Sequence, residues 1–92
     1  MIETRQINGC LGLKVRMPNA NLLLIVGEKG YIMCGYLDIG AAEKLGDAAC
    51  IVTGVSTFHD VLKSEVKSLT SKAEELGVRE GMVGEQALEI LR

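Results

Sequence analysis

The fold is decided by residues 11–17, which read Leu-Gly-Leu-Lys-Val-Arg-Met. Apolar side chains alternate there with glycine or a basic residue, and this period of two predicts a strand with one buried face. The Pro-Asn-Ala-Asn stretch over residues 18–21 has the chemistry of a turn and ends the strand. Leu22 to Val26 is then aliphatic at every position, which predicts a second strand that is apolar on both faces.

Two more strands are predicted on either side of this pair. Gly27 and Gly30 enclose a four-residue loop that suits a hairpin, and residues 31–37 follow as a strand that is apolar on both sides. Residues 1–9 form the other candidate strand, although their alternation is blurred. This part of the chain therefore predicts a set of antiparallel strands.

The hydrophobic period changes after Leu37, where a helix is predicted. Asp38 is a suitable N-cap, residues 41–45 are good helix formers, and Gly46 fits the position after the helix. Residues 48–53 then predict a short buried strand. Strand, helix and strand together form a β-α-β unit.

The chain after this unit predicts helices. Thr57 and Asp60 have the spacing of a capping box, and apolar residues keep helical spacing from there to Leu76. One helix over this stretch is an open alternative. The three serines and one threonine in residues 63–71 favour two helices instead, with a new N-cap at Thr70.

Together the elements predict an α+β fold with two layers. N-terminal antiparallel strands precede the β-α-β unit, and short C-terminal helices follow, the last over residues 85–91. We expect a single domain over residues 1–92, with a β-rich oligomerisation region at 1–37 and an α/β region at 38–92. A hydrophobic share of 48% with 24% charged residues is typical of a globular protein.

Charge and cysteine content narrow the expected partners and compartment. The net charge of −2 disfavours general nucleic-acid binding, and the longest aliphatic run, Leu22–Val26, is far shorter than the ~20 residues of a membrane span. The N-terminus lacks a basic segment followed by an apolar one, so we expect no secretory signal. The three cysteines are then expected to be reduced thiols in a cytoplasmic protein with neither nucleic acid nor a membrane as a partner.

Self-association is expected because the predicted strands expose more apolar surface than the helices can cover. A few short helices can cover one side of the sheet, and large exposed apolar patches are rare on monomers. A second copy of the chain is the expected cover for the other side. The expected interface residues alternate along the two central strands: Leu11, Leu13, Val15, Leu22, Leu24 and Val26.

Cys34 is the residue that most invites a chemical role. It lies beside Gly35 and a few residues before a strand-to-helix junction, where ligands often bind. A ligand-binding site is therefore predicted at Cys34, Gly35, Asp38 and Gly54. Cys34 is also a candidate nucleophile, and His59 is the only histidine that could serve as its base. The alternative is that the thiol packs as a small hydrophobic group, so no catalytic residue is assigned.

Metal and phosphate sites have less support. One histidine and cysteines without Cys-x-x-Cys spacing match no zinc pattern, so we expect neither a metal nor another cofactor. Residues 30–35 have glycines at Walker A spacing, but Tyr36 and Leu37 follow where lysine and serine or threonine are needed. Residues 53–57 lead into a helix and either offer backbone N–H groups to an anion or simply cap that helix.

Three segments carry a resemblance to a known family: residues 30–38 (Gly-Tyr-Ile-Met-Cys-Gly-Tyr-Leu-Asp), 54–58 (Gly-Val-Ser-Thr-Phe) and 76–88 (Leu-Gly-Val-Arg-Glu-Gly-Met-Val-Gly-Glu-Gln-Ala-Leu). They resemble the YunC-like family, or domain of unknown function 1805, over nearly the whole chain. The resemblance implies an N-terminal β region that mediates tetramerisation, and no established activity, substrate or cofactor. The family's Met-Cys-Gly maps onto residues 33–35, whereas the serine or threonine in its Gly-Met-x-Gly segment is Val83 here.

Three classes of function remain open. The first is a homo-oligomeric module, preferably a tetramer, that binds a small metabolite or a protein partner near residues 34–38 and Gly54. The second is a thiol-dependent enzyme that uses Cys34. The third is a structural subunit of a larger assembly.

Overall fold

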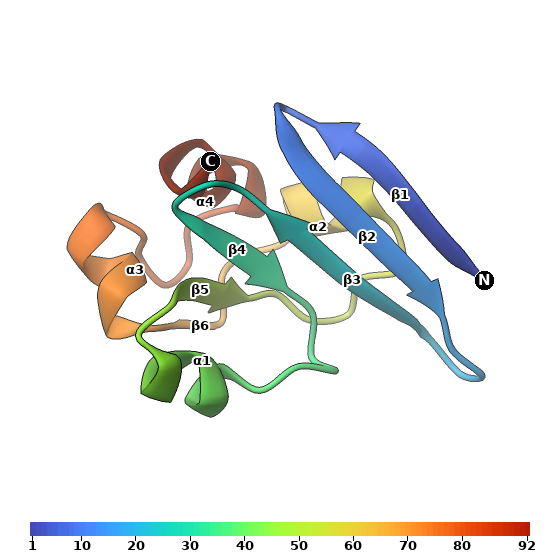
Figure 1. Cartoon of the computed structure of the whole chain (residues 1–92), viewed down its shortest axis with the longest axis horizontal. Helices are drawn as coiled ribbons and strands as arrows, with labels where there is room; N and C mark the ends of the chain where they lie inside the picture. Colours follow the sequence, from blue (N-terminus) through green and yellow to red (C-terminus); the bar gives the residue numbers. More distant parts are fainter.

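One sheet of six strands runs through the chain, and each strand pairs with its neighbours in chain order (Figure 1). The computed structural model describes all residues from Met1 to Arg92. Every neighbouring pair is antiparallel except β4 and β5, which are parallel. The strands are β1 (Ile2–Ile7), β2 (Cys10–Arg16), β3 (Asn21–Val26), β4 (Gly30–Met33), β5 (Ala48–Ile51) and β6 (Ser68–Leu69).

The N-terminal strands form as the sequence predicts. β1 and β2 are joined by Asn8 and Gly9, whose φ angles of 51° and 84° are the positive values that a type I′ turn requires. In the next pair, Leu13 of β2 lies opposite Leu24 of β3. The alternating apolar residues of the two strands therefore share one face of the sheet.

β4 ends at Met33, so the prediction of a strand as far as Leu37 is wrong. The N–H of Cys34 still donates to the carbonyl of Leu23, 3.1 Å away. The carbonyl of Cys34, however, leaves the ladder and accepts the N–H of Leu37 at 3.2 Å. Residues 34–37 thus form a turn, and an apolar run alone does not distinguish such a turn from a strand.

α1 (Ile39–Leu45) completes the predicted β-α-β unit. The Asp38 carboxylate accepts the N–H of Gly40 at 2.9 Å and caps the helix. Gly46 ends the helix in the left-handed conformation, with a φ of 79° that glycine adopts without strain. Both predicted caps are confirmed.

Two helices form where one long helix was the open alternative. α2 (Phe58–Lys63) has the predicted capping box between Thr57 and Asp60, and α3 (Ser71–Leu76) follows the predicted N-cap Thr70. The last helix, α4 (Gly84–Leu91), begins one residue before its predicted start. At 8 residues α4 is the longest helix, and no helix of the chain has the length and hydropathy needed to cross a membrane.

The chain between α2 and α3 adds β6, a strand that the sequence analysis missed. Lys67 donates its N–H to the carbonyl of Ile51 at 2.8 Å, and Thr70 donates its N–H to the carbonyl of Ala49 at 2.9 Å. These bonds add β6 to the sheet beside β5. A two-residue strand is too short to show a hydrophobic period.

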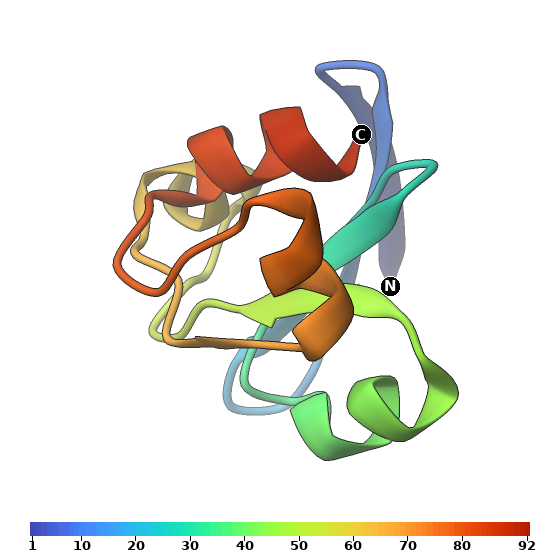
Figure 2. The same cartoon turned by 90° about the vertical axis from the view of Figure 1, so that its left-hand side faces the viewer.

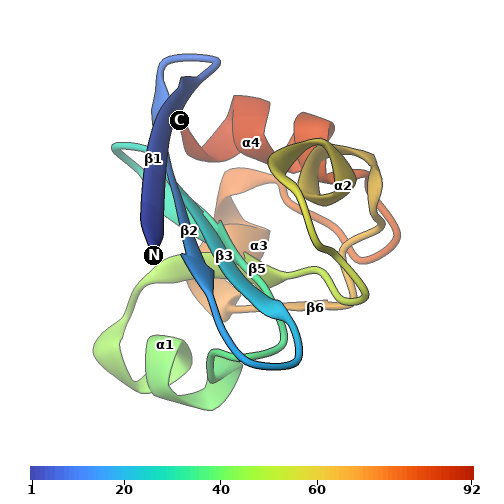
Figure 3. The ribbon, with the colours of Figure 1, turned by 90° about the vertical axis from the view of Figure 1, so that its right-hand side faces the viewer.

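The two faces of the sheet are covered unequally (Figures 2 and 3). α2, α3 and α4 pack on one face, here called the inner face, and Leu23, Ile25 and Ile32 lie fully buried beneath them. The opposite, outer face is covered by α1 only at the β4–β5 end, where Ala42 packs against Met33. The α+β fold is confirmed, but helices cover part of both sides and not one side alone.

Candidate functional site

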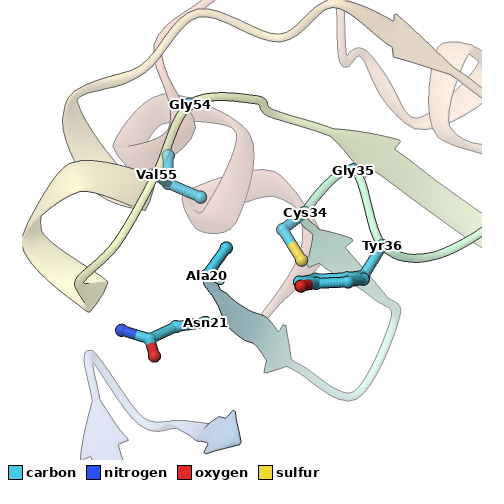
Figure 4. Close-up of a pocket in the computed structure, with 7 residues that line it drawn as sticks. All are labelled: Ala20, Asn21, Cys34, Gly35, Tyr36, Gly54 and Val55. Carbon is cyan, nitrogen blue, oxygen red and sulfur yellow. The ribbon is translucent and has the colours of Figure 1, made fainter. Parts of the chain in front are cut away.

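A pocket of about 280 Å³ lies where the end of β4 meets the loop after β5 (Figure 4). It brings together three of the predicted ligand-site residues, Cys34, Gly35 and Gly54. The other lining residues, which the sequence analysis did not select, are Ala20, Asn21, Tyr36 and Val55. Residues 34–36 and 54–55 flank the pocket from opposite sides in Figure 4, with residues 20–21 between them. We call this cavity the Cys34 pocket.

The Cys34 side chain takes the place of a backbone acceptor in the sheet. Its Sγ accepts the N–H of Leu23 at 3.2 Å, while its own carbonyl bonds to Leu37 in the turn. The residue is only 4% exposed. The thiol therefore supports the junction of β3 and β4 as well as lining the pocket.

Four residues that line the Cys34 pocket have backbone N–H groups that the chain itself does not use. The N–H groups of Gly35, Tyr36, Gly54 and Val55 have no hydrogen-bond acceptor within the chain. No charged side chain lines the pocket, and Tyr36 is 48% exposed. This arrangement suits a small ligand with hydrogen-bond acceptors and some apolar surface.

Asp38, the fourth predicted ligand-site residue, does not line the Cys34 pocket. Its carboxylate is engaged in capping α1. It lies instead at the edge of a second cavity, a groove of about 440 Å³ between α1 and the outer face of the sheet. The groove is otherwise apolar, and its lining residues are Leu24, Val26, Tyr31, Met33, Leu37, Ala41, Ala42 and Leu45.

The α1 groove was missed, although the sequence holds a signal for it. Leu37, Ala41 and Leu45 are spaced by four residues, which places them along one stripe of a helix. Leu45 is 76% exposed. By contrast, Ala20 lies in the β2–β3 turn and Asn21 begins β3, and both reach the Cys34 pocket because β3 pairs with β4.

Cys34 and His59 do not form a nucleophile–base pair in the structure. His59 is exposed on α2 and forms no hydrogen bond with the thiol. The anion site considered at residues 53–57 is also filled by the chain itself, because the Asp60 carboxylate accepts the N–H groups of Ser56 and Thr57 at 2.9 and 3.2 Å. These bonds, chiefly that from Ser56, lower the pKa of Asp60 and keep a negative charge where an anion would bind.

The other two cysteines lie in the core. Cys10 is 3% exposed and Cys50 is fully buried. Burial raises the pKa of Cys50 to about 12, and it also raises the pKa of Cys10. Both side chains are therefore neutral thiols that pack as small hydrophobic groups.

The six residues expected at an oligomer interface all lie on the outer face. Leu11 pairs with Val26 across β2 and β3, and the other four form the next two pairs along the strands. Leu11 is 53% exposed and Val26 is 36% exposed, whereas the remaining four are partly buried. Leu22 also packs against the main core. Beyond β2, Ile2 of β1 extends this apolar surface and is 71% exposed.

Comparisons with known proteins agree in placing the chain among proteins without an assigned function. The family model described as "Domain of unknown function (DUF1805)" matches residues 33–91. The uncharacterized protein YunC of Bacillus subtilis (strain 168) is 37% identical over 78 residues, which is 80% of this chain and 77% of YunC. The crystal structure of a protein of unknown function, TA1206 from Thermoplasma acidophilum, superposes with a TM-score of 0.90 at 36% identity, covering 100% of this chain and 92% of that one.

Proposed function

The chain belongs to the DUF1805 family, and we propose that it is a self-associating module, preferably a tetramer, that binds a small metabolite in the Cys34 pocket. The observation that carries the proposal is the uncovered part of the outer face. Leu11, Val26 and Ile2 are large apolar residues on three adjacent strands, and each is more than a third exposed.

A second copy of the chain is the cover that the outer face best fits. The apolar α1 groove continues the exposed surface, because Val26 belongs to both. Burying aliphatic side chains releases roughly 25 cal/mol for each Å² removed from water, so a continuous patch of this kind favours association. Charged residues would oppose that burial, and Asp38 is the only charged residue lining the groove.

Light scattering coupled to size exclusion tests the self-association. The wild-type chain is expected to elute as an oligomer at micromolar concentration, and the double variant Leu11→Lys/Val26→Lys as a smaller species. Leu76→Lys is the matched control, because Leu76 lies on α3 above the inner face and is 44% exposed. An oligomer that survives the double variant unchanged would show that the outer face is not the interface.

The ligand proposal rests on the free backbone donors and the lack of charge in the Cys34 pocket. Gly35→Leu is a suitable variant to enlarge a residue that lines the pocket, since a Cβ at this position would meet only Thr53 Cγ2 at 3.8 Å and Gly35 has no positive φ. A metabolite at 100 times its Kd is expected to add about 2.7 kcal/mol to the free energy of unfolding.

A thermal-shift screen with a metabolite library measures this effect. Metabolites that raise the melting temperature of the wild-type chain should not raise that of Gly35→Leu, and should still raise that of Ala41→Leu, which enlarges a side chain in the α1 groove. A library without a single stabilising compound would contradict the ligand proposal and favour a structural subunit.

A further inference from the structure

β1 forms one edge of the sheet and leaves one side of its backbone unpaired. Arg16 donates its N–H to the carbonyl of Met1 at 3.0 Å, and hydrogen-bonded positions recur at every second residue of an antiparallel pair. Glu3, Arg5 and Ile7 therefore direct their N–H and C=O groups toward β2. The same groups of residues 2, 4 and 6 point away from the sheet.

The other edge of the sheet offers no comparable surface. β6 has only two residues, whereas β1 has six. An unpaired strand of this length is a ready partner for another strand. A second copy of β1 could pair along this edge. Whether it does depends on how well the side chains of the two strands match across the edge.

The side chains of β1 are complementary to their own copy. In an antiparallel pairing centred on Thr4, each Thr4 lies opposite the other, Ile2 lies opposite Gln6, and Glu3 lies opposite Arg5. The outward N–H and C=O groups of residues 2, 4 and 6 then all find partners across the edge. Glu3 and Arg5 occupy the positions without hydrogen bonds, where opposite side chains come closest.

From this match we infer that two copies pair antiparallel along β1, centred on Thr4, with reciprocal ion pairs between Glu3 of one copy and Arg5 of the other. This inference rests on the proposed self-association and names an edge contact distinct from the outer face. Within one chain, Glu3 already contacts both Arg5 at 3.1 Å and Lys14 at 3.7 Å. All four charges of the new pair would lie on the same side of the joined sheet as these contacts.

Edge pairing and outer-face association together would give the preferred tetramer. A two-fold axis through the β1 pair keeps both outer faces on the same side of one continuous sheet. The exposed Ile2 of each copy, 71% exposed in one chain, then lies at the centre of a doubled apolar surface. Two such dimers can cover each other's outer faces, which gives a closed tetramer with two kinds of symmetric contact.

Cysteine cross-linking tests the register. In the inferred pair the two Cα atoms at position 4 lie about 5.5 Å apart, within the ~4.4–6.8 Å range of disulfides. Oxidised Thr4→Cys is therefore expected to run as a covalent dimer. In the control Gln6→Cys the introduced thiols lie ~13 Å apart and should not cross-link, because four residues separate position 6 from its partner position. The native cysteines are buried.

Charge reversal tests the ion pairs. Glu3→Arg carries positive side chains at both positions and Arg5→Glu carries negative ones, so each variant alone should self-associate through the edge roughly tenfold more weakly. An equimolar mixture should form a heterodimer, and the double variant Glu3→Arg/Arg5→Glu should recover wild-type association. A misfolded variant would not be rescued by mixing.

The outcomes separate this inference from the proposed function. If neither cysteine variant cross-links, or both do equally, while Leu11→Lys/Val26→Lys still reduces the oligomer, edge pairing in this register is wrong and outer-face association stands. If the wild-type chain is a monomer, both are wrong. Cross-linking at position 4 alone, together with recovery in the mixture, would establish the edge pair.

Discussion

At Cys34 the side chain, and not the backbone carbonyl, accepts a hydrogen bond of the sheet. The carbonyl that would have received the N–H of Leu23 bonds to Leu37 instead, and the thiol replaces it at 3.2 Å. A buried N–H without an acceptor costs about 1–3 kcal/mol, so this contact gives the residue a structural role. Sequence alone shows an unusual Met-Cys-Gly, but not which atom of the cysteine is engaged.

Substitution of Cys34 separates the two roles of the thiol. Cys34→Ala leaves the Leu23 N–H without an acceptor and is expected to lower the free energy of unfolding by about 2 kcal/mol. Cys34→Ser keeps an acceptor at this position and should lose clearly less. Urea unfolding of the three proteins measures the difference. Equal losses in the two variants would contradict a hydrogen-bonding role for the side chain.

Tyr31 provides a prediction about pH. Its hydroxyl donates to the Asp47 carboxylate at 2.7 Å, and burial, aided by that carboxylate, raises the pKa of Tyr31 to about 12. The unfolded chain releases this proton near pH 10 while the folded chain still holds it. The stabilising contribution is therefore complete below about pH 10 and is lost as the pH rises toward 12.

Comparison with Tyr31→Phe isolates this contribution. At pH 7 the wild-type chain is expected to be about 1.5 kcal/mol more stable than the variant, because a hydrogen bond to a charged group is lost. That advantage should shrink between pH 10 and pH 12, as followed by urea unfolding at each pH. The buried Cys50 is present in both proteins, so its own titration cancels. An advantage that stays constant to pH 12 would contradict the assignment.

At the scale of elements, Thr70 joins α3 to the sheet. Its Oγ1 accepts the N–H of Ala49 at 3.0 Å and of Ala73 at 3.3 Å, and it donates to the carbonyl of Asp47 at 2.7 Å. The residue is 1% exposed, so water cannot replace these partners. The N-cap of α3 is thus also a connection to β5.

Replacing this hydroxyl is expected to be costly. Thr70→Val keeps the shape of the side chain but leaves buried backbone groups unpaired, and should lower the free energy of unfolding by about 3 kcal/mol. Thr57→Val, at the exposed N-cap of α2, is the control and should cost about 1 kcal/mol. Thermal unfolding followed by circular dichroism compares them. Similar losses at the two caps would mean that the contacts of Thr70 with β5 add nothing.

The elements show where sequence reasoning succeeds and where it stops. The caps at Asp38, Thr57 and Thr70 were predicted because a cap depends on residues within four positions of each other. The end of β4 was not, because it depends on which way one carbonyl points. β6 depends on distant β5 and has no period of its own.

The candidate site also combines residues that the sequence predicts from local chemistry with features that it does not predict. Cys34, Gly35 and Gly54 were predicted from local chemistry and lie in one pocket, but Asp38 was grouped with them only because it is near in sequence. Whether any of the four binds a ligand stays a prediction. The α1 groove was missed because it forms between a helix and strands that precede it in the chain.

For the whole molecule, the decisive property is the imbalance between the two faces of the sheet. The inner face lies under α2, α3 and α4, whereas the outer face has only α1 at one end. The strand pairing places Leu11 and Val26 side by side in the uncovered part. The alternation in residues 11–17 already predicted this shared face, since a period of two assigns each residue to one side of a strand.

Sedimentation equilibrium of the wild-type chain tests the account most directly. Measured over a range of micromolar concentrations, the mass should approach four times the 9.9 kDa of one chain, because in our proposal the outer face and the edge each join two copies. A mass of 9.9 kDa at every concentration would contradict the account.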